Sequence, residues 1–110
     1  MPIETRKISF SQLELSDAIE RFAKSTKRAM PPGRIVGCAI GANGGGVTVS
    51  MTVKNSADGA SGTVRFDHAS VAAALIRYCM ETKIPLAKAA EKSVQAEGAG
   101  VALTLRIPEN

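Results

Sequence analysis

The chain has few of the residues on which catalysis, metal binding and base stacking usually depend. Its 110 residues include no tryptophan, one tyrosine, one histidine (His68) and two cysteines (Cys38 and Cys79). A single histidine excludes a histidine-rich metal site, and so few aromatic rings make a poor platform for stacking nucleic-acid bases. The sequence therefore predicts no metal, no cofactor and no catalytic residue, and it favours a protein that is not an enzyme.

The cysteines and the apolar runs bear on location. Cys38 and Cys79 are far apart and match no metal or redox spacing, and secreted disulfide scaffolds are shorter and richer in cysteine. We therefore predict two free thiols in a reducing compartment, which favours the cytoplasm. No apolar run approaches the roughly 18 residues of a membrane span, and the first ten residues lack the apolar core of a signal peptide. No membrane partner is expected.

Length and composition predict one globular domain over residues 1–110. Hydrophobic residues make up 45% of the chain and charged residues 22%, which is typical of an ordinary globular protein. A chain of this size buries roughly two-thirds of its unfolded surface, so a core can form without disulfides. No internal repeat or linker divides the sequence.

Residues 11–14, SQLE, have the pattern of a capping box, in which Ser11 and Glu14 each bind the backbone amide of the other. A short strand at 7–10 is expected before it. The helix that starts here, or at Ser16, buries one stripe of apolar residues at helical spacing: Leu15, Ala18, Ile19, Phe22 and Ala23. The prolines at 31 and 32 end it.

The glycines at 41, 44, 45 and 46 raise the question of a phosphate-binding loop. Their spacing fits the start of a P-loop, but Val47 and Thr48 stand where lysine and serine or threonine are required. A strand follows, whereas a phosphate loop leads into a helix. Because Asn43-Gly44 is typical of a tight hairpin, we predict a hairpin between strands at 34–40 and 47–53.

The remainder of the chain predicts one more strand, a long helix and a last strand. Turn residues at 55–62 lead to a strand at 63–66, and Asp67 caps a helix that ends before Pro85. Residues 86–94 favour a second, short helix, and 101–107 alternate as a strand. The order β-α-β-β-β-α-(α)-β predicts an α+β fold in two layers, with two main helices on one face of a mainly antiparallel sheet of four or five strands.

Alternation in these strands also defines the face of the sheet away from the helices. This candidate binding face is rich in hydroxyl groups, has a basic fringe and includes Thr48, Ser50, Thr52, Arg65 and Arg106. Because no catalytic constellation is present, our leading hypothesis is a small intracellular interaction module. It would associate with itself, as a possible homodimer, or with another protein, through this polar face or through an edge strand.

Nucleic-acid binding is the first alternative. The formal net charge is +4, and residues 1–55 hold eight Lys and Arg against four Asp and Glu. Lys27, Arg28 and Arg34 are the candidate contacts. The order helix, three strands, helix over 11–83 is similar to that of double-stranded-RNA-binding domains, but their lysine cluster at the second helix is replaced here by DHASVAAAL. The similarity in element order alone therefore gives no support for RNA binding.

A second alternative is a small enzyme or ligand carrier with its site under the 55–62 loop. Asp67 and His68 are adjacent in sequence, but no nucleophile is identified that they would serve. His68 is interpreted as a residue of the helix start.

Overall fold

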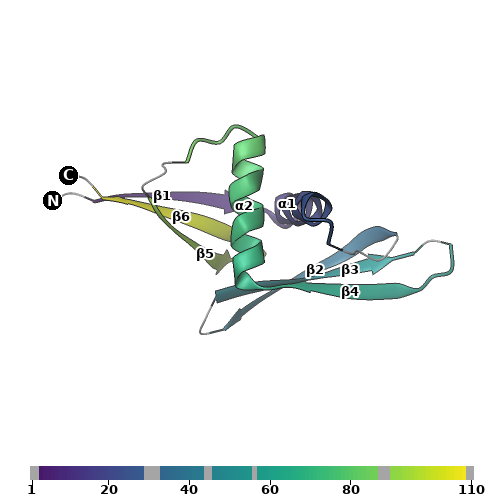
Figure 1. Cartoon of the computed structure of the whole chain (residues 1–110). Coiled ribbons are helices and arrows are strands. Elements are labelled where there is room, and N and C mark those ends of the chain that lie inside the picture. The colour runs from purple at the N-terminus through teal and green to yellow at the C-terminus, as the bar shows by residue number, and fades with distance from the viewer. Residues whose placement is uncertain (1–2, 29–32, 44–45, 56, 87–89, 109–110) are drawn as a thin grey trace.

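The computed structural model in Figure 1 describes residues 3–28, 33–43, 46–55, 57–86 and 90–108. These ranges contain six strands and two helices, in the order β1 (Ile3–Phe10), α1 (Gln12–Ser25), β2 (Arg34–Asn43), β3 (Gly46–Lys54), β4 (Ser61–Phe66), α2 (His68–Glu81), β5 (Glu91–Glu97) and β6 (Gly100–Pro108). The predicted α+β class and the order of the elements up to α2 are confirmed.

The strands form two three-stranded antiparallel sheets rather than one sheet of four or five. One sheet has the order β1-β6-β5 and the other has the order β2-β3-β4. β6 pairs with β1 on one side and with β5 on the other, so the last strand of the chain does not join the central meander. The two sheets approach each other where β5 lies near β2 and β3.

The short helix predicted for 86–94 is replaced by a strand. β5 covers Glu91–Glu97 and pairs with β6 so that Val94 lies opposite Leu103; residues 87–89 lie outside the described part of the chain. Val94 is buried whereas Ser93 and Gln95 are exposed. Pairing with β6 thus determines the conformation, and it overrides the local helix propensity of the alanines and lysines.

The glycine-rich stretch forms the predicted hairpin. β2 and β3 pair over their length, and the last pair in the register joins Asn43 to Gly46. Residues 44 and 45 lie outside the described residues, so the predicted Asn43-Gly44 turn falls partly outside them. Gly46 has a φ of +142°, a backbone conformation open essentially to glycine alone.

Both helices begin where the sequence predicts. The Ser11 hydroxyl accepts a hydrogen bond from the Glu14 amide at 3.2 Å, and the Glu14 carboxylate accepts one from the Ser11 amide at 2.9 Å, so the capping box is present. Asp67 caps α2 by accepting a hydrogen bond from the Ser70 amide at 2.9 Å. These contacts fix the two points at which the chain passes from a sheet into a helix.

One hydrophobic core joins both helices to both sheets. The alternating apolar residues of 47–53 are buried, as are Val101, Leu103 and Leu105, whereas Ile107 at the end of the predicted strand 101–107 is only half-buried. Phe10, Leu15, Ile19 and Leu75 meet them from the first strand and the helices. Phe22, predicted on the buried stripe of the first helix, is only half-buried.

The molecule is elongated. Its radius of gyration is 15.2 Å and its extents are 59 × 27 × 19 Å, whereas a compact chain of 100 residues has a radius of about 13 Å. In Figure 1 the two sheets project from opposite sides of the helices, with α2 standing between them and α1 seen end-on above β2 and β3. Much of each sheet therefore extends beyond the cover of the helices.

Candidate interaction surface at the edge of β2

The two sheets expose four edge strands, and three of them carry the features by which proteins prevent unwanted pairing. β1 bears Glu4, Arg6 and Lys7, and its Arg6 guanidinium donates a hydrogen bond to the carbonyl of Pro85 at 2.9 Å. β5 bears three charged residues in seven, EKSVQAE. On β4, the Arg28 side chain donates a hydrogen bond to the carbonyl of Arg65. Charges and bound side chains of this kind keep a strand edge from pairing with another chain.

β2 differs from the other three edges mainly in charge. It is ten residues long, and after Arg34 its sequence, IVGCAIGAN, carries no charge. It pairs with β3 on one side. On the opposite side, the Gln12 side-chain amide donates a hydrogen bond to the carbonyl of Cys38 at 3.1 Å. A long edge without charges after its first residue can pair with another chain, whereas the bound Gln12 amide and the bulge near its start limit the part of the strand that is open to such pairing.

A β-bulge in β2 leaves the side chain of Val36 exposed to solvent. The register shifts between Ile35 and Gly37, so that Val36 has no partner on β3. Such an extra residue bends the strand and redirects its side chain. The Val36 side chain is 50% exposed, and Leu13 at the start of α1 is 84% exposed.

Leu13 and Val36 lie on the walls of one groove. The groove runs between the first turns of α1 and the first half of β2, has a volume of about 170 Å³, and is also lined by Gln12, Ser16 and Cys38. Two exposed apolar side chains beside an open strand edge define the candidate surface, which we call the β2 edge surface. An added strand would cover both of them.

The surroundings of Cys38 in this groove do not activate its thiol as a nucleophile. Partial burial raises its pKa, and the hydrogen bond with the Ser16 side chain opposes this only in part. A thiol with a raised pKa is a weak nucleophile at neutral pH. Cys38 is therefore expected to react more slowly than a free thiol at neutral pH.

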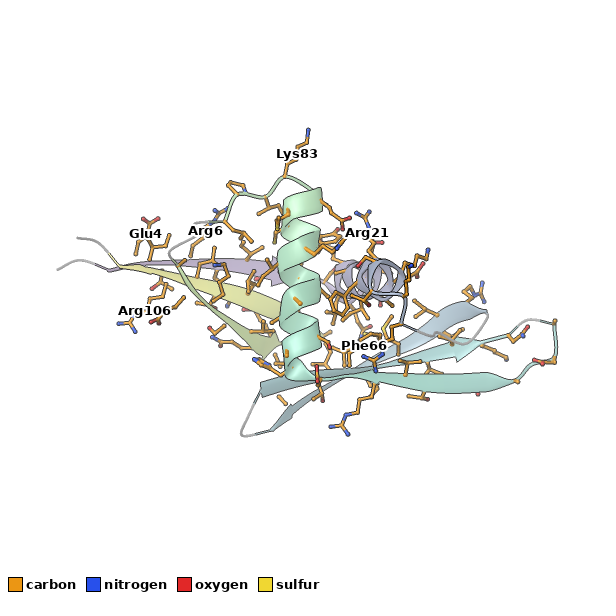
Figure 2. All side chains as sticks on the ribbon, in the orientation of Figure 1. Glu4, Arg6, Arg21, Phe66, Lys83 and Arg106 are labelled. Atoms are coloured by element: carbon orange, nitrogen blue, oxygen red, sulfur yellow. The ribbon has the colours of Figure 1, made fainter. Side chains whose placement is uncertain are left out.

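The candidate binding face predicted from the sequence is only partly assembled. Ser50 lies opposite Ala39 on one side and Arg65 on the other, and the hydroxyl residues of β3 face small residues of β2: Gly37 beside Thr52 and Gly41 beside Thr48. Arg106 belongs to β6 in the other sheet. Figure 2 shows it at the far end of that sheet, well separated from Phe66 of β4. The structure thus brings together Thr48, Ser50, Thr52 and Arg65 but separates Arg106 from them.

The three candidate nucleic-acid contacts have different surroundings. Lys27 is exposed and has a φ of +55°, and Arg34 is exposed at the start of β2. The Arg28 guanidinium lies over the Phe66 ring, 4.3 Å from its centroid, in addition to its bond to the carbonyl of Arg65. Arg28 is therefore committed to holding the end of α1 against β4.

His68 has a local structural partner. Its Nδ1 accepts a hydrogen bond from the Val47 amide at 3.0 Å, which ties the start of α2 to the start of β3. Within the described ranges, no three His, Cys, Asp or Glu side chains gather as a metal site would require. Neither α1 nor α2 has the length and apolar content that a membrane crossing demands.

The sequence predicted association through an edge strand in general terms, but it did not predict the residues of the β2 edge surface. Leu13 carried a usable signal, because it is an apolar residue outside the buried stripe of its helix. Val36 carried none, because its exposure depends on the bulge. Comparisons of the chain with protein-family models, with curated proteins and with solved structures gave no match. The residues of the chain itself therefore carry the functional argument.

Proposed function

We propose that the protein is a non-enzymatic interaction module that self-associates by pairing the free edge of β2 with the same edge of a second copy. The observation that supports this proposal is the difference in charge among the edges: β1 and β5 bear several charged residues and Arg28 binds the backbone of β4, whereas β2 has no charge after Arg34 and lies next to the exposed side chains of Leu13 and Val36. Two free thiols, Cys38 and Cys79, support a reducing compartment such as the cytoplasm.

Pairing of two β2 strands would satisfy backbone groups that the single chain leaves to water. A two-fold axis makes such an interface self-complementary, because each residue contributes twice. Antiparallel pairing would join two three-stranded sheets into one sheet of six strands. Leu13 and Val36 of each copy would then lose exposed apolar surface, which favours association.

Sedimentation velocity over a range of concentrations tests this proposal. Val36→Lys should weaken the edge association by about 30-fold, because a charge at a buried central contact costs about 2 kcal/mol or more. Thr63→Lys is the matched control, since it places the same charge on an exposed residue of the same sheet, on β4. An average mass that falls for Val36→Lys and holds for Thr63→Lys supports the proposal; identical distributions for Val36→Lys and the natural chain refute it.

A further inference from the structure

The face of the β2-β3-β4 sheet that points away from the helices carries charge of one sign only. Its charged residues are Arg34, Lys54 and Arg65, and all of them are exposed. The strands β2, β3 and β4 contain no aspartate and no glutamate. Figure 1 shows α1 and α2 on one side of this sheet and none of the labelled elements on the other. We call this open surface the basic face.

The β-bulge at Val36 places Arg34 on the basic face. Residues directly opposite each other on neighbouring strands share one face of a sheet, and Thr52 and Lys54 both alternate with buried residues of β3. Gly37 lies opposite Thr52. Arg34, three residues earlier, lies opposite Lys54. In a regular strand, two residues that are three positions apart point to opposite faces, so the extra residue of the bulge turns Arg34 to the side of Lys54.

These cations have no acidic partner within the chain. Arg34 and Lys54 are direct cross-strand neighbours of like charge, an arrangement that costs stability. Within the described ranges, no carboxylate forms an ion pair with them or with Arg65. The acids that flank β4 in the sequence are engaged locally, since Asp58 accepts an amide hydrogen bond within its own turn and Asp67 caps α2. The positive charge of the basic face is therefore available to an anionic partner.

The outer face of the β1-β6-β5 sheet has the opposite arrangement. There Lys7 forms an ion pair with Glu97, and Ser9 donates a hydrogen bond to the same carboxylate at 2.6 Å. Arg106 lies opposite Glu91. Because acids accompany the cations on that face, the excess of positive charge on the basic face is a property of one sheet and not of the chain as a whole.

Hydroxyl groups accompany the cations of the basic face. The hydroxyl residues that share it are Thr48, Ser50, Thr52, Ser61 and Thr63. Arginine, lysine, serine and threonine are among the side chains that contact the phosphate oxygens of DNA. The phenylalanines and the tyrosine all lie in the core or pack against it, so none is free to stack on an unpaired base. This chemistry fits the backbone of a duplex, whose bases are already stacked.

The spacing of the cations fits the two backbones that border one groove of B-form DNA. Arg65 lies opposite Ser50 on the neighbouring strand, four residues along β3 from Lys54. At about 3.3 Å per residue and about 4.8 Å between strands, the two positions are about 14 Å apart. The major groove of B-DNA is about 12 Å wide, and long side chains span the difference. The deep, narrow major groove of A-form RNA offers no such match.

From these observations we infer that the basic face binds the phosphate backbone of double-stranded DNA across the major groove, without reading its sequence. The inference goes beyond self-association and does not rest on it, because the basic face is a different surface from the β2 edge surface.

Fluorescence anisotropy with a labelled DNA duplex of mixed sequence tests this inference. The natural chain should bind at low salt, and the logarithm of its affinity should fall against the logarithm of the salt concentration with a slope of about −3, because three cations displace counterions. The double variant Lys54→Gln, Arg65→Gln should lose about 10-fold or more in affinity at low salt, and its slope should fall to about −1. No binding by the natural chain at low salt overturns the inference.

The double variant Lys7→Gln, Arg106→Gln is the matched control, because it removes one lysine and one arginine from the outer face of the other sheet. Its affinity should stay within about 3-fold of that of the natural chain, since distant charges are screened. Equal losses in the two double variants would show attraction to net charge alone and would overturn the basic face. The thermal midpoint of Lys54→Gln, Arg65→Gln should hold or rise, because the repulsion between Arg34 and Lys54 is removed.

An RNA duplex of the same length and a single DNA strand test the geometry. Each should bind about 5-fold or more weakly than the DNA duplex, because the first lacks a wide major groove and the second needs aromatic platforms for its bases. Equal affinity for the RNA duplex would overturn the match to the major groove. Tighter binding of the single strand would overturn recognition of a duplex.

Discussion

The imidazole of His68 lies directly against Gly46, so close that a Cβ atom on Gly46 would stand 2.4 Å from its Nδ1. The same nitrogen accepts the hydrogen bond from the amide of Val47. The only histidine of the sequence therefore links α2 to β3 through this hydrogen bond. Glycine is required at position 46 for two reasons: the space taken by the imidazole and the positive φ. Two requirements at one residue can be separated by mutation.

Gly46→Ala is expected to destabilise the protein in two ways, through the φ of +142° and through the overlap with the His68 ring. Chemical denaturation of Gly46→Ala, His68→Ala and the double variant measures the second contribution. The double variant should be more stable than the sum of the single effects predicts by about 1 kcal/mol or more, since removing the ring removes the overlap. Additive effects would show that the ring does not restrict this site.

Arg28→Ala is expected to lower the free energy of unfolding by about 1 kcal/mol, because the guanidinium both covers the Phe66 ring and binds the carbonyl of Arg65. Lys27→Ala removes the same charge from the neighbouring residue and should change stability by less than about 0.5 kcal/mol. Urea denaturation of the two variants checks this. Equal losses would mean that charge, rather than the contacts of Arg28, is responsible.

The cap of α2 should make stability depend on acid pH. The backbone hydrogen bond from Ser70, followed by that residue's side-chain bond, holds the pKa of Asp67 below its usual range. Because the folded pKa is lower than the unfolded one, the stabilisation is complete above about pH 4 and is lost as the pH falls through the folded pKa.

Thermal unfolding between pH 7 and pH 2 tests this dependence. Asp67→Ala should melt below the natural chain at pH 7, and the difference should shrink at the acid end, where the protonated carboxyl caps only as an uncharged acceptor. Asp67→Asn keeps an acceptor that does not titrate, so its melting temperature should exceed that of Asp67→Ala throughout the range. A constant difference between the natural chain and Asp67→Ala would show that the carboxylate does not titrate in this window.

The two cysteines should react differently with thiol reagents. Cys79 is fully buried in the core, and burial raises its pKa despite the nearby charge of Arg6. Cys38 is half-buried. In native conditions near pH 8 a disulfide reagent should therefore modify at most one thiol, slowly, and Cys38→Ser should abolish that signal. Denaturation should expose both thiols, and rapid reaction of two thiols in the native protein would contradict the core position of Cys79.

Local patterns in the sequence predicted the helices and strands better than they predicted which strands pair with each other. The capping box at Ser11 and Glu14, the alternation of 47–53 and the hairpin after Asn43 depend on neighbouring residues, and each is found as predicted. Alternation shows which face of a strand is buried, but it does not show which strand lies beside it. For that reason the division into two sheets, and the separation of Arg106 from Arg65, could not be predicted.

The misassigned segment shows the same limit. Leu86, Ala90 and Val94 recur at helical spacing, yet Val94 is buried as a strand residue because it pairs with Leu103. The β2 edge surface was missed for a related reason: the exposure of Val36 follows from a register shift against β3, and no local pattern encodes such a shift. What the chain does depends here on contacts between distant segments.

Pairing of β1 with β6 also has a consequence for the order in which the molecule folds. The register from Ile3–Pro108 to Phe10–Val101 joins the first strand to the last, whereas β2, β3 and β4 follow one another as a meander. Closing a long loop costs more entropy than closing a hairpin. The meander can therefore form early, but β1 has no partner strand until the last residues of β6 are available. A chain emerging from the ribosome therefore exposes the β2 edge surface before β1 has paired with β6.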